Sequence, residues 1–390
     1  MINKPAIKVL NVTTYNEDCG VAKFQANIQE CFNKYKTTIH SDIYQYSLNH
    51  LKKQNNTDRR ALIKDIVKVA AEYDVVHIQH EFGLFYKNGV GFGEIVQALK
   101  RARKQIFVTI HTAPSHVLIQ NQRPPAYAIR SSLKYLVTGL KNKRLKKKLL
   151  YDFRLCDRLI TLNRNTREEL VGIVGITPER IFTTILPVRD DVIIPDNEIR
   201  KIFPKNTKLI VINGFINHYK GFDKAIRALS FLPEEYRLVI AGGINPDSGN
   251  PADMDAIGNL IAELQLTERV HITGYIEGDS ELQRLVSGCD VAIYPYDINY
   301  YRLASSAAVG VAINAEVPAV AFPAESFKEI NDFMEGVLTL TQSSTYFELA
   351  QKIPKTVGHD KQILKDFKRE NSYKVYAERL LDIYNKSKAR

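Results

Sequence analysis

The stretch that decides the fold is LIVINGFINHYKGFDKAIRAL, residues 209–229. It opens with LIVI, a short β-branched and leucine run typical of a strand buried on both faces. A short loop containing glycine follows, and FDKAIRAL then spaces its apolar residues as an amphipathic helix does. A strand, a tight loop and a helix in this order predict one half of a parallel β–α–β unit.

Lys220 closes that loop, directly before the predicted helix. A lysine at a helix N-terminus is well placed to bind a diphosphate, because the helix dipole and the free N–H groups add to its charge. An isolated Lys-Gly pair is more often a solvated lysine before a turn glycine. The remainder of the chain has to decide between the two interpretations.

The same alternation of strand and helix extends in both directions from residues 209–229. Strand-like apolar runs come before and after it, separated by amphipathic stretches. The earlier runs are Ile7–Val12, Val75–Gln79, Ile106–Ile110, Arg158–Leu162 and Phe182–Leu186, and the later ones are Lys208–Asn213, Arg237–Ala241, Arg269–Thr273, Val291–Pro295 and Ala319–Phe322. This pattern predicts an α/β protein with parallel sheets covered on both faces.

Between the two series lies PVRDDVIIPDNEIRKIFPKN, residues 187–206, which contains three prolines and many charges and is typical of a connection between domains. The prediction is therefore two doubly wound, Rossmann-like domains, residues 1–190 and 207–365, joined by a linker at 191–206. Residues 366–390 are the remaining C-terminal segment. Ligands of such sheets bind at the carboxyl ends of the strands, so we expect a site in a central cleft.

Composition agrees with a globular protein. Of 390 residues, 45% are apolar and 25% charged, and 54 Lys and Arg against 43 Asp and Glu give a net charge of +11, which favours anionic partners. No apolar run approaches the roughly 20 residues needed to span a bilayer. The four cysteines are far apart, as in a protein with reduced thiols. We expect a cytoplasmic protein.

Several segments after residue 207 resemble, in order, the donor domain of the GT4-type glycosyltransferases, a family of the GT-B fold. They are GFINHYKG (214–221), LVIAGG (238–243), VHITGYI (270–276), DVAIYP (290–295), ASSA (304–307) and VPAVA (317–321). The terminal ENSYKVYAERLLDIY resembles the closing helix of the family, which packs back on the first domain. CGVAKF (19–24), HIQHEFG (77–83) and TIHT (109–112) match the first domain more loosely.

The resemblance implies two Rossmann-like domains that face a central cleft, with the C-terminal helix crossing back to the first. It also implies transfer of a sugar from a nucleotide-sugar co-substrate, UDP- or GDP-linked, with retention of configuration. No cofactor is implied. A non-catalytic nucleotide-sugar-binding protein and a sugar epimerase on a similar fold are the other interpretations of the same pattern.

The residues that match the family's motifs form two sets. The predicted donor-binding set is Gly20, Gly214, Lys220, Tyr275, Ser305 and Ser306, and the predicted catalytic set is His111, Glu81 and His80. On its own, His111 at a strand end would be a partly buried histidine with satisfied hydrogen bonds, and the resemblance favours a role in the reaction. Glu81 has the alternative of a helix cap or salt bridge, Gly20 of a tight turn, and the two serines of helix capping.

The chain departs from the family at two places. The paired glutamates of the donor domain fall near Leu303 and Val311, and the arginine that often follows the loop glycine is Phe215. The ASSA segment resembles the serine-containing variant of the acidic loop. The departure changes how the ribose would be held, and it keeps the non-catalytic interpretation open.

Asp253-Met254-Asp255 has the D-x-D spacing with which carboxylates hold a divalent metal against a diphosphate. It follows Asn-Pro-Ala and precedes an apolar helix, so we interpret it as acidic residues at a helix start. No cluster of His and Cys has zinc-ligand spacing, and no P-loop is present. The sequence therefore predicts no metal site.

The run KNKRLKKK, Lys141 to Lys148, holds six cations in eight positions. Such a run binds an anionic membrane surface, binds nucleic acid phosphates, or is a solvated helix face. The first interpretation favours a lipid-linked or cell-envelope glycan as acceptor and a place at the inner face of the membrane. The second favours DNA with modified bases as the acceptor.

Overall fold

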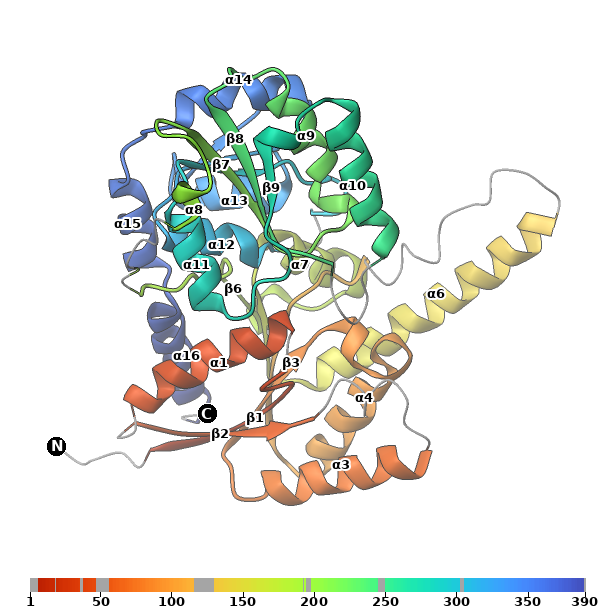
Figure 1. The fold of residues 1–390 in the computed structure, drawn as a ribbon. Helices are drawn as coiled ribbons and strands as arrows, with labels where there is room; N and C mark the ends of the chain where they lie inside the picture. Colours follow the sequence, from red (N-terminus) through yellow and green to blue (C-terminus); the bar gives the residue numbers. More distant parts are fainter. Residues whose placement is uncertain are drawn as a thin grey trace. The chain divides into compact units, whose positions relative to one another are not determined.

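The computed structural model describes residues 6–17, 19–35, 38–46, 56–115, 130–191, 193, 198–244, 250–301 and 305–388. It divides into two compact units. Figure 1 colours the chain from red at the N-terminus to blue at the C-terminus. The N-terminal unit comprises residues 1–185, 303–305 and 373–390, and the C-terminal unit comprises 186–302 and 306–372.

The N-terminal unit is built on a six-stranded parallel sheet in the order β2-β1-β3-β4-β5-β6. The sequence did not predict β2, because its central residues are polar and only half-buried, as befits an edge strand. The strands are β1 (Ile7–Thr13), β2 (Ile39–Gln45), β3 (Val75–His80), β4 (Gln105–Ile110), β5 (Arg158–Thr161) and β6 (Ile181–Thr183).

Helices cover both faces of this sheet. In Figure 1, α1 and α16 lie together on one face, while α3, α4 and the base of α6 lie on the other. The helices are α1 (Gly20–Lys34), α3 (Asn56–Ala70), α4 (Tyr86–Arg101), α6 (Arg130–Leu155), α7 (Arg164–Glu169) and α16 (Tyr373–Lys388), with shorter turns at Phe82–Leu84, Leu170–Val174 and Pro178–Arg180.

The C-terminal unit has a second six-stranded parallel sheet, in the order β12-β11-β10-β7-β8-β9. Its strands are β7 (Lys208–Asn213), β8 (Tyr236–Ala241), β9 (Val270–Ile272), β10 (Val291–Tyr294), β11 (Ala319–Ala321) and β12 (Leu338–Leu340). The sequence did not predict β12, in which Leu338 alone is buried. Both sheets confirm the doubly wound α/β fold expected from the sequence.

Helices again cover both faces of the second sheet. They are α8 (Glu198–Lys201), α9 (Phe222–Leu229), α10 (Pro251–Glu263), α11 (Asp279–Ser287), α12 (Ala307–Asn314), α13 (Glu325–Phe333), α14 (Tyr346–Thr356) and α15 (Gln362–Glu370), with single turns at His218–Lys220 and Thr267–Arg269. In the part of the chain that the structure describes, no helix combines the length and apolarity needed to cross a membrane.

The C-terminal helix α16 belongs to the core of the N-terminal unit, as expected from the resemblance. His77 of β3, completely buried, holds it: Nδ1 lies 2.5 Å from the Tyr384 hydroxyl and Nε2 lies 2.8 Å from the Thr109 hydroxyl. The Tyr384 ring also packs edge-on against Phe107. A buried polar group is costly unless it is hydrogen-bonded, so this network fixes α16 against one place on the sheet.

Helix α6 is attached to α4 through a buried carboxylate. Asp152 is fully buried, and its two oxygens bond Lys148 Nζ at 2.7 Å and Gln97 Nε2 at 3.2 Å. The carboxylate fits because α4 has a glycine opposite it, as a Cβ at Gly93 would lie 2.1 Å from Asp152 Oδ2. Leu149, adjacent to the lysine, is buried in the core of the unit.

We predict that Gly93→Ala lowers the free energy of unfolding by about 1–3 kcal/mol, because the methyl group displaces a buried, paired carboxylate. Gly258→Ala in α10 is the matched control: nothing lies within 4 Å of its added Cβ. That substitution should instead stabilise by about 0.5–1 kcal/mol through helix propensity. Urea unfolding followed by circular dichroism measures both, and equal effects of the two substitutions would contradict the proposed role of Gly93.

Candidate functional site

Three loops meet at the carboxyl edge of the C-terminal sheet, after β7, β8 and β9. Their backbones approach too closely for side chains: a Cβ at Gly242 would lie 2.2 Å from the Gly214 carbonyl oxygen, and one at Gly243 would lie 2.7 Å from Tyr275 N. Gly214 itself has φ +110°, a conformation that favours glycine. The glycines therefore create a flat backbone surface at the strand ends, where ligands of such sheets bind.

Lys220 lies over this surface. Its ammonium occupies the space where a Gly214 side chain would start, since a Cβ there would be 2.3 Å from Nζ. The next residue, Gly221, has φ +70° and a hypothetical Cβ only 2.0 Å from the Pro295 carbonyl oxygen, which locks the turn against the end of β10. No carboxylate of the described residues pairs with Lys220, and burial lowers its pKa to about 8. An ammonium so placed is ready to bind an anion.

The N-terminus of α12 is joined to the same loop. Asn213 Nδ2 donates to the Ala308 carbonyl at 3.2 Å, and the Tyr294 hydroxyl donates to Asn213 Oδ1 at 2.8 Å. Ser306 occupies the N-cap position of α12 without making a side-chain capping hydrogen bond. The positive end of a helix dipole is thus held beside the Gly214 turn, where it adds to the attraction for a negative group.

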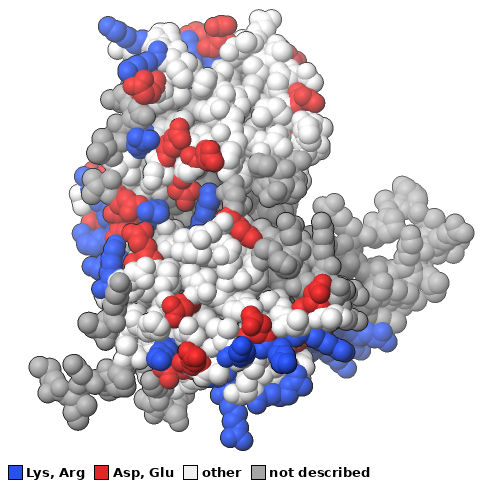
Figure 2. Space-filling view, turned by 60° about the horizontal axis from the view of Figure 1, so that its bottom comes forward, with Lys and Arg blue, Asp and Glu red and all other residues white. Residues whose placement is uncertain are grey.

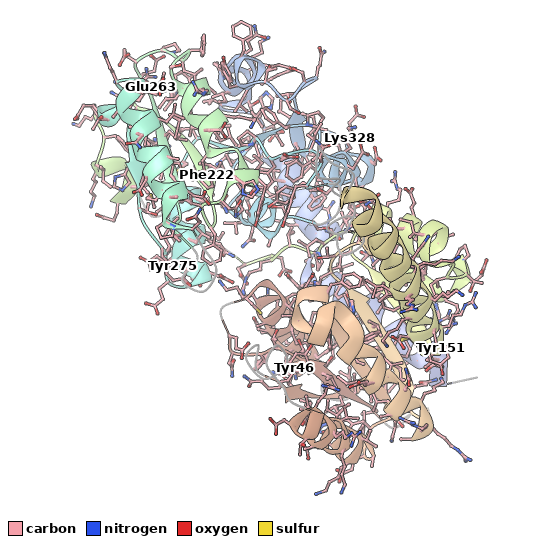
Figure 3. The ribbon with its side chains drawn as sticks, turned by 90° about the vertical axis from the view of Figure 1, so that its right-hand side faces the viewer. Tyr46, Tyr151, Phe222, Glu263, Tyr275 and Lys328 are labelled. Atoms are coloured by element: carbon pink, nitrogen blue, oxygen red, sulfur yellow. The ribbon has the colours of Figure 1, made fainter. Side chains whose placement is uncertain are left out.

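An aromatic pair flanks the loop. The rings of Phe215 and Tyr275 are parallel within 3°, with centroids 5.8 Å apart. Tyr275, labelled in Figure 3, lies at a loop at the edge of the C-terminal unit and is 42% exposed. Exposed parallel rings beside an anion site are suited to a nucleobase, which stacks on aromatic side chains.

In the N-terminal unit, His111 directly follows β4. Its backbone N–H donates to the His80 carbonyl at 3.0 Å, and its ring nitrogen Nε2 lies 2.9 Å from Gln79 Oε1. Phe24 of α1 packs edge-on against the ring at 4.9 Å. Burial lowers the pKa of His111 to about 4, so the ring is neutral at pH 7.

The structure separates His80 from His111. Successive side chains of a strand point to opposite faces of the sheet. The His80 ring therefore lies on the face opposite to that of Gln79. There it is completely buried among the rings of Phe82, Phe85, Phe92 and Phe153. Neither ring nitrogen has a hydrogen-bond partner among the described residues. These surroundings leave His80 a core side chain, and the predicted acid/base role has no geometric support.

The remaining predicted residues of this unit lie at the same carboxyl edge. Glu81 accepts a hydrogen bond from the Thr112 hydroxyl, one residue beyond His111. Gly20 begins α1, and a Cβ there would meet nothing within 4 Å. The side chain of Cys19 caps the helix by accepting from Ala22 N at 3.3 Å. Packing within the described residues does not require a glycine at position 20.

Ser305 and Ser306, adjacent in sequence, belong to different units. The Ser305 hydroxyl donates to the Leu162 carbonyl at 3.0 Å and accepts from Asn163 Nδ2 at 3.3 Å, so it is bound to the turn that begins α7. Ser306 starts α12 beside the Lys220 loop. The predicted donor role thus has local geometric support at Ser306, whereas Ser305 is engaged by the N-terminal unit.

The D-x-D sequence lies where helix-start residues are expected. Asp253 is in the first turn of α10, and the Asn250 side chain caps that helix by accepting from Ala252 N at 3.2 Å. No group of three or more His, Cys, Asp or Glu side chains arranged to hold a metal ion occurs within the described ranges. The expected absence of a metal site stays a prediction.

The basic run forms part of α6, and its members have different surroundings. Figure 2 shows Lys and Arg side chains gathered along the lower right of one face of the protein. Lys143, Arg144, Lys146 and Lys147 are exposed, whereas Lys148 pairs with the buried Asp152. The side chain of Lys141 lies outside the described residues. Leu145 and Leu149 pack into the hydrophobic core, so this apolar stripe is already covered by protein.

Two residues close to the candidate site were not predicted from the sequence. Gln79 and Gln25 are both fully buried, and Gln79 Nε2 donates to Gln25 Oε1 at 3.0 Å. The available signal was a glutamine within a strand predicted to be buried, since a buried amide needs partners.

We predict that His80→Phe reduces the acid sensitivity of the fold. Burial lowers the pKa of His80 to about 3, against about 6.5 when the chain is unfolded. The contribution of the neutral His80 to the free energy of unfolding is complete above about pH 6.5. It is lost as the pH falls towards 3, because in this range only the unfolded state gains the proton. By proton linkage, His80 alone lowers the free energy of unfolding by on the order of 2 kcal/mol between pH 8 and pH 5.

Urea unfolding of wild type and variant at both pH values measures this difference. The exposed His359 supplies the control, since His359→Phe removes no buried ring. The assignment of His80 to the core would be wrong if His80→Phe lost as much stability on acidification as the wild type.

Residues 195–357 match the family described as Glycosyl transferases group 1. A curated relative, D-inositol 3-phosphate glycosyltransferase of Xylanimonas cellulosilytica, is 30% identical over 131 residues, which are 31% of this chain and 31% of that protein. The chain thus aligns with less than a third of the length of this curated relative.

Solved structures share the fold over nearly the whole chain. HepE of Anabaena, crystallised with UDP and glucose, has a TM-score of 0.68 at 14% identity and covers 97% of this chain and 100% of its own. Sucrose-phosphate synthase of Thermosynechococcus elongatus has a TM-score of 0.71 at 13% identity, covering 98% and 99%. The chain therefore has the GT-B fold, residues 195–357 correspond to a group 1 glycosyl transferase domain, and together these comparisons support a glycosyltransferase.

Proposed function

We propose that this protein is a GT4-type glycosyltransferase that moves a sugar from a UDP- or GDP-linked donor to an acceptor. The observation that carries the proposal is the Lys220 ammonium, partly buried beside the Gly214 turn and the start of α12, with no carboxylate partner among the described residues. A diphosphate would supply the missing negative charge. The matched group 1 segment contains this loop, and HepE, of the same fold, was crystallised with UDP-glucose.

The nucleotide would lie along the carboxyl edge of the C-terminal sheet. Its diphosphate binds Lys220 and the N–H groups at the start of α12, and its base stacks on the Phe215–Tyr275 pair. Because Phe215 replaces the family's arginine, the lysine and the helix dipole provide the positive charge of this loop. Ser306, at the N-cap, makes no side-chain capping hydrogen bond, and its hydroxyl would turn to a phosphate oxygen.

Transfer of the sugar leaves negative charge on the departing nucleoside diphosphate. The Lys220 ammonium and the α12 N–H groups are positioned in advance for that charge, which is how preorganised electrostatics lower a barrier. We therefore propose a reaction that needs no metal ion, with retention of anomeric configuration as the resemblance implies. His111, neutral and partly buried, is a candidate for contact with a sugar hydroxyl, and Glu81 for orienting the acceptor.

We predict that Lys220→Met weakens binding of UDP or GDP roughly ten- to hundredfold, the effect of losing one charged hydrogen bond. Isothermal titration with nucleoside diphosphates and with the corresponding nucleosides measures the effect. The nucleosides should bind wild type and variant alike, since they lack the phosphates that the lysine contacts.

Lys224→Met is the matched control, because Lys224 lies one helical turn further on and is paired with Asp223 at 3.7 Å. The control should bind the diphosphate as the wild type does, and wild-type affinity should be equal with and without EDTA. Equal affinity of Lys220→Met and wild type for the diphosphate would refute the site, and loss of affinity in EDTA would refute metal independence.

The acceptor is proposed to be a lipid-linked or cell-envelope glycan, reached at the inner face of a membrane. The four exposed cations of the basic run would attract anionic lipid, each contributing about 1 kcal/mol. Because Leu145 and Leu149 are packed in the core, the attraction is electrostatic and involves no insertion of this stripe into lipid. A sugar acceptor on modified DNA is the alternative that the same cations support.

We predict that the protein binds vesicles containing anionic lipid at low salt, and that exchanging Lys143, Arg144, Lys146 and Lys147 for glutamate abolishes binding. Lys148 is left unchanged, because its partner Asp152 is buried and the fold would suffer. Cosedimentation across a salt series measures the affinity. The control exchanges Lys328, paired with Glu325 on α13, for glutamate.

Duplex DNA is titrated in parallel under the same salt conditions. Tight, salt-sensitive binding to DNA with none to vesicles would replace the lipid-linked acceptor by DNA. Binding to neither would refute both and leave a soluble acceptor. Release of nucleoside diphosphate from a UDP- or GDP-sugar separates a transferase from a protein that only binds the donor.

A further inference from the structure

Three side chains of the N-terminal unit form a hydrogen-bonded series that ends at His111. His111 Nε2 lies 2.9 Å from Gln79 Oε1, and Gln79 Nε2 lies 3.0 Å from Gln25 Oε1. Both glutamines are completely buried, whereas His111 is only partly buried. The series runs from the interior to the carboxyl edge of the sheet.

The strand register brings these groups together. Gln79 of β3 is opposite Thr109 of β4, and the chain continues through Ile110 to His111, so Gln79 and His111 share a face of the sheet. Helix α1 covers that face and contributes Gln25 and Phe24. The arrangement is therefore fixed by backbone pairing on one side and by helix packing on the other.

The hydrogen bonds determine which nitrogen of His111 carries the proton. An amide oxygen only accepts, so Nε2 is the donor and the neutral ring keeps its lone pair on Nδ1. Gln25 orients the Gln79 amide, because its own oxygen accepts from Gln79 Nε2. Among the described residues, no group hydrogen-bonds Nδ1.

The two other histidines near the His111 ring are neutral, and the one nearby carboxylate is hydrogen-bonded elsewhere. From β3 come His77 and His80, whose pKa values burial lowers to about 3. The nearby carboxylate of Glu81 accepts from the Thr112 hydroxyl. Histidines that act as bases are commonly oriented by a carboxylate, which stabilises the charged ring. An amide partner instead favours a histidine that stays neutral and accepts one hydrogen bond.

We propose that Gln79, oriented by Gln25, is a positioning residue that holds His111 as the Nε2–H tautomer, so that Nδ1 accepts a hydrogen bond from a sugar hydroxyl. The identification of the bound molecule as a sugar rests on the proposed function. The tautomer itself does not, because it follows from the contacts within the N-terminal unit.

The test compares wild type with Gln79→Leu, which removes the amide, and Gln79→Glu, which replaces it by a carboxylate of the same shape. Gln29→Glu is the matched control: it makes the same chemical change on α1, at a glutamine that bonds Ser41. Nitrogen-15 spectra of histidine-labelled full-length protein report which ring nitrogen of His111 is protonated, with His111→Gln assigning the signal.

We expect wild type and Gln29→Glu to show one neutral Nε2–H tautomer from pH 5.5 to pH 8. Gln79→Leu should give a mixture of tautomers, and Gln79→Glu should show His111 protonated at the acidic end of this range, because a carboxylate raises the pKa of its partner. A wild-type ring protonated at Nδ1, or Gln79→Glu spectra identical to those of the control, would overturn the proposal.

Sugar transfer gives the second measurement. Gln79→Leu should lower kcat about tenfold with little change in the KM for the donor. Gln79→Glu should gain a pH dependence absent from wild type, with activity rising as the pH rises and His111 loses its proton, because only then can Nδ1 accept. If the spectra agree and no sugar is transferred, the proposed function fails while the tautomer assignment stands. If transfer occurs with unaltered pH dependence in Gln79→Glu, the positioning role fails.

Discussion

Burial of parallel strands on both faces is the constraint from which the other features follow. In each unit, helices cover the sheet on both sides, so a polar side chain inside a strand must find its partner within the protein. His77 does so with Tyr384, and Asn213 with Tyr294 and Ala308. The same two residues thereby fix α16 and α12. Lys220 and His111 follow their strands and lie at the carboxyl edges of the two sheets.

Apolar runs of this kind are visible in a sequence, and they made the doubly wound parallel architecture of each half predictable, although not the order of the strands in each sheet. Strands that are not buried on both faces were not predicted from the sequence. The edge strand β2 has one buried residue, Ile39, and β12 likewise has one, Leu338. Neither has enough buried surface to mark its sequence. The Lys220 loop was predictable because a strand, a glycine and a helix follow one another within 21 residues.

The histidines show where prediction from the chain alone stops. His80 and His111 both stand at strand ends, and only the pairing of β3 with β4 reveals that they point to opposite faces. His80 is enclosed by four phenylalanines that come from three different segments of the chain. Their convergence depends on how α4 and α6 pack, which local sequence does not encode. Ser305 is a similar case, because its hydroxyl is bound by a turn more than a hundred residues earlier.

The two departures from the motifs of the GT4-type glycosyltransferases have one physical consequence for the Lys220 loop. Without the paired glutamates, and with Phe215 in place of an arginine, the loop holds a single cation over a surface of glycine backbone. Burial lowers the pKa of Lys220 to about 8, so without a bound anion the lysine is charged at neutral pH but loses its proton about one pH unit higher. A bound diphosphate would favour the charged form and raise the pKa again, since an opposite charge opposes the desolvation. Binding of a diphosphate and protonation of Lys220 would therefore be coupled, and the anion would be held most strongly below pH 8, where Lys220 already carries its proton.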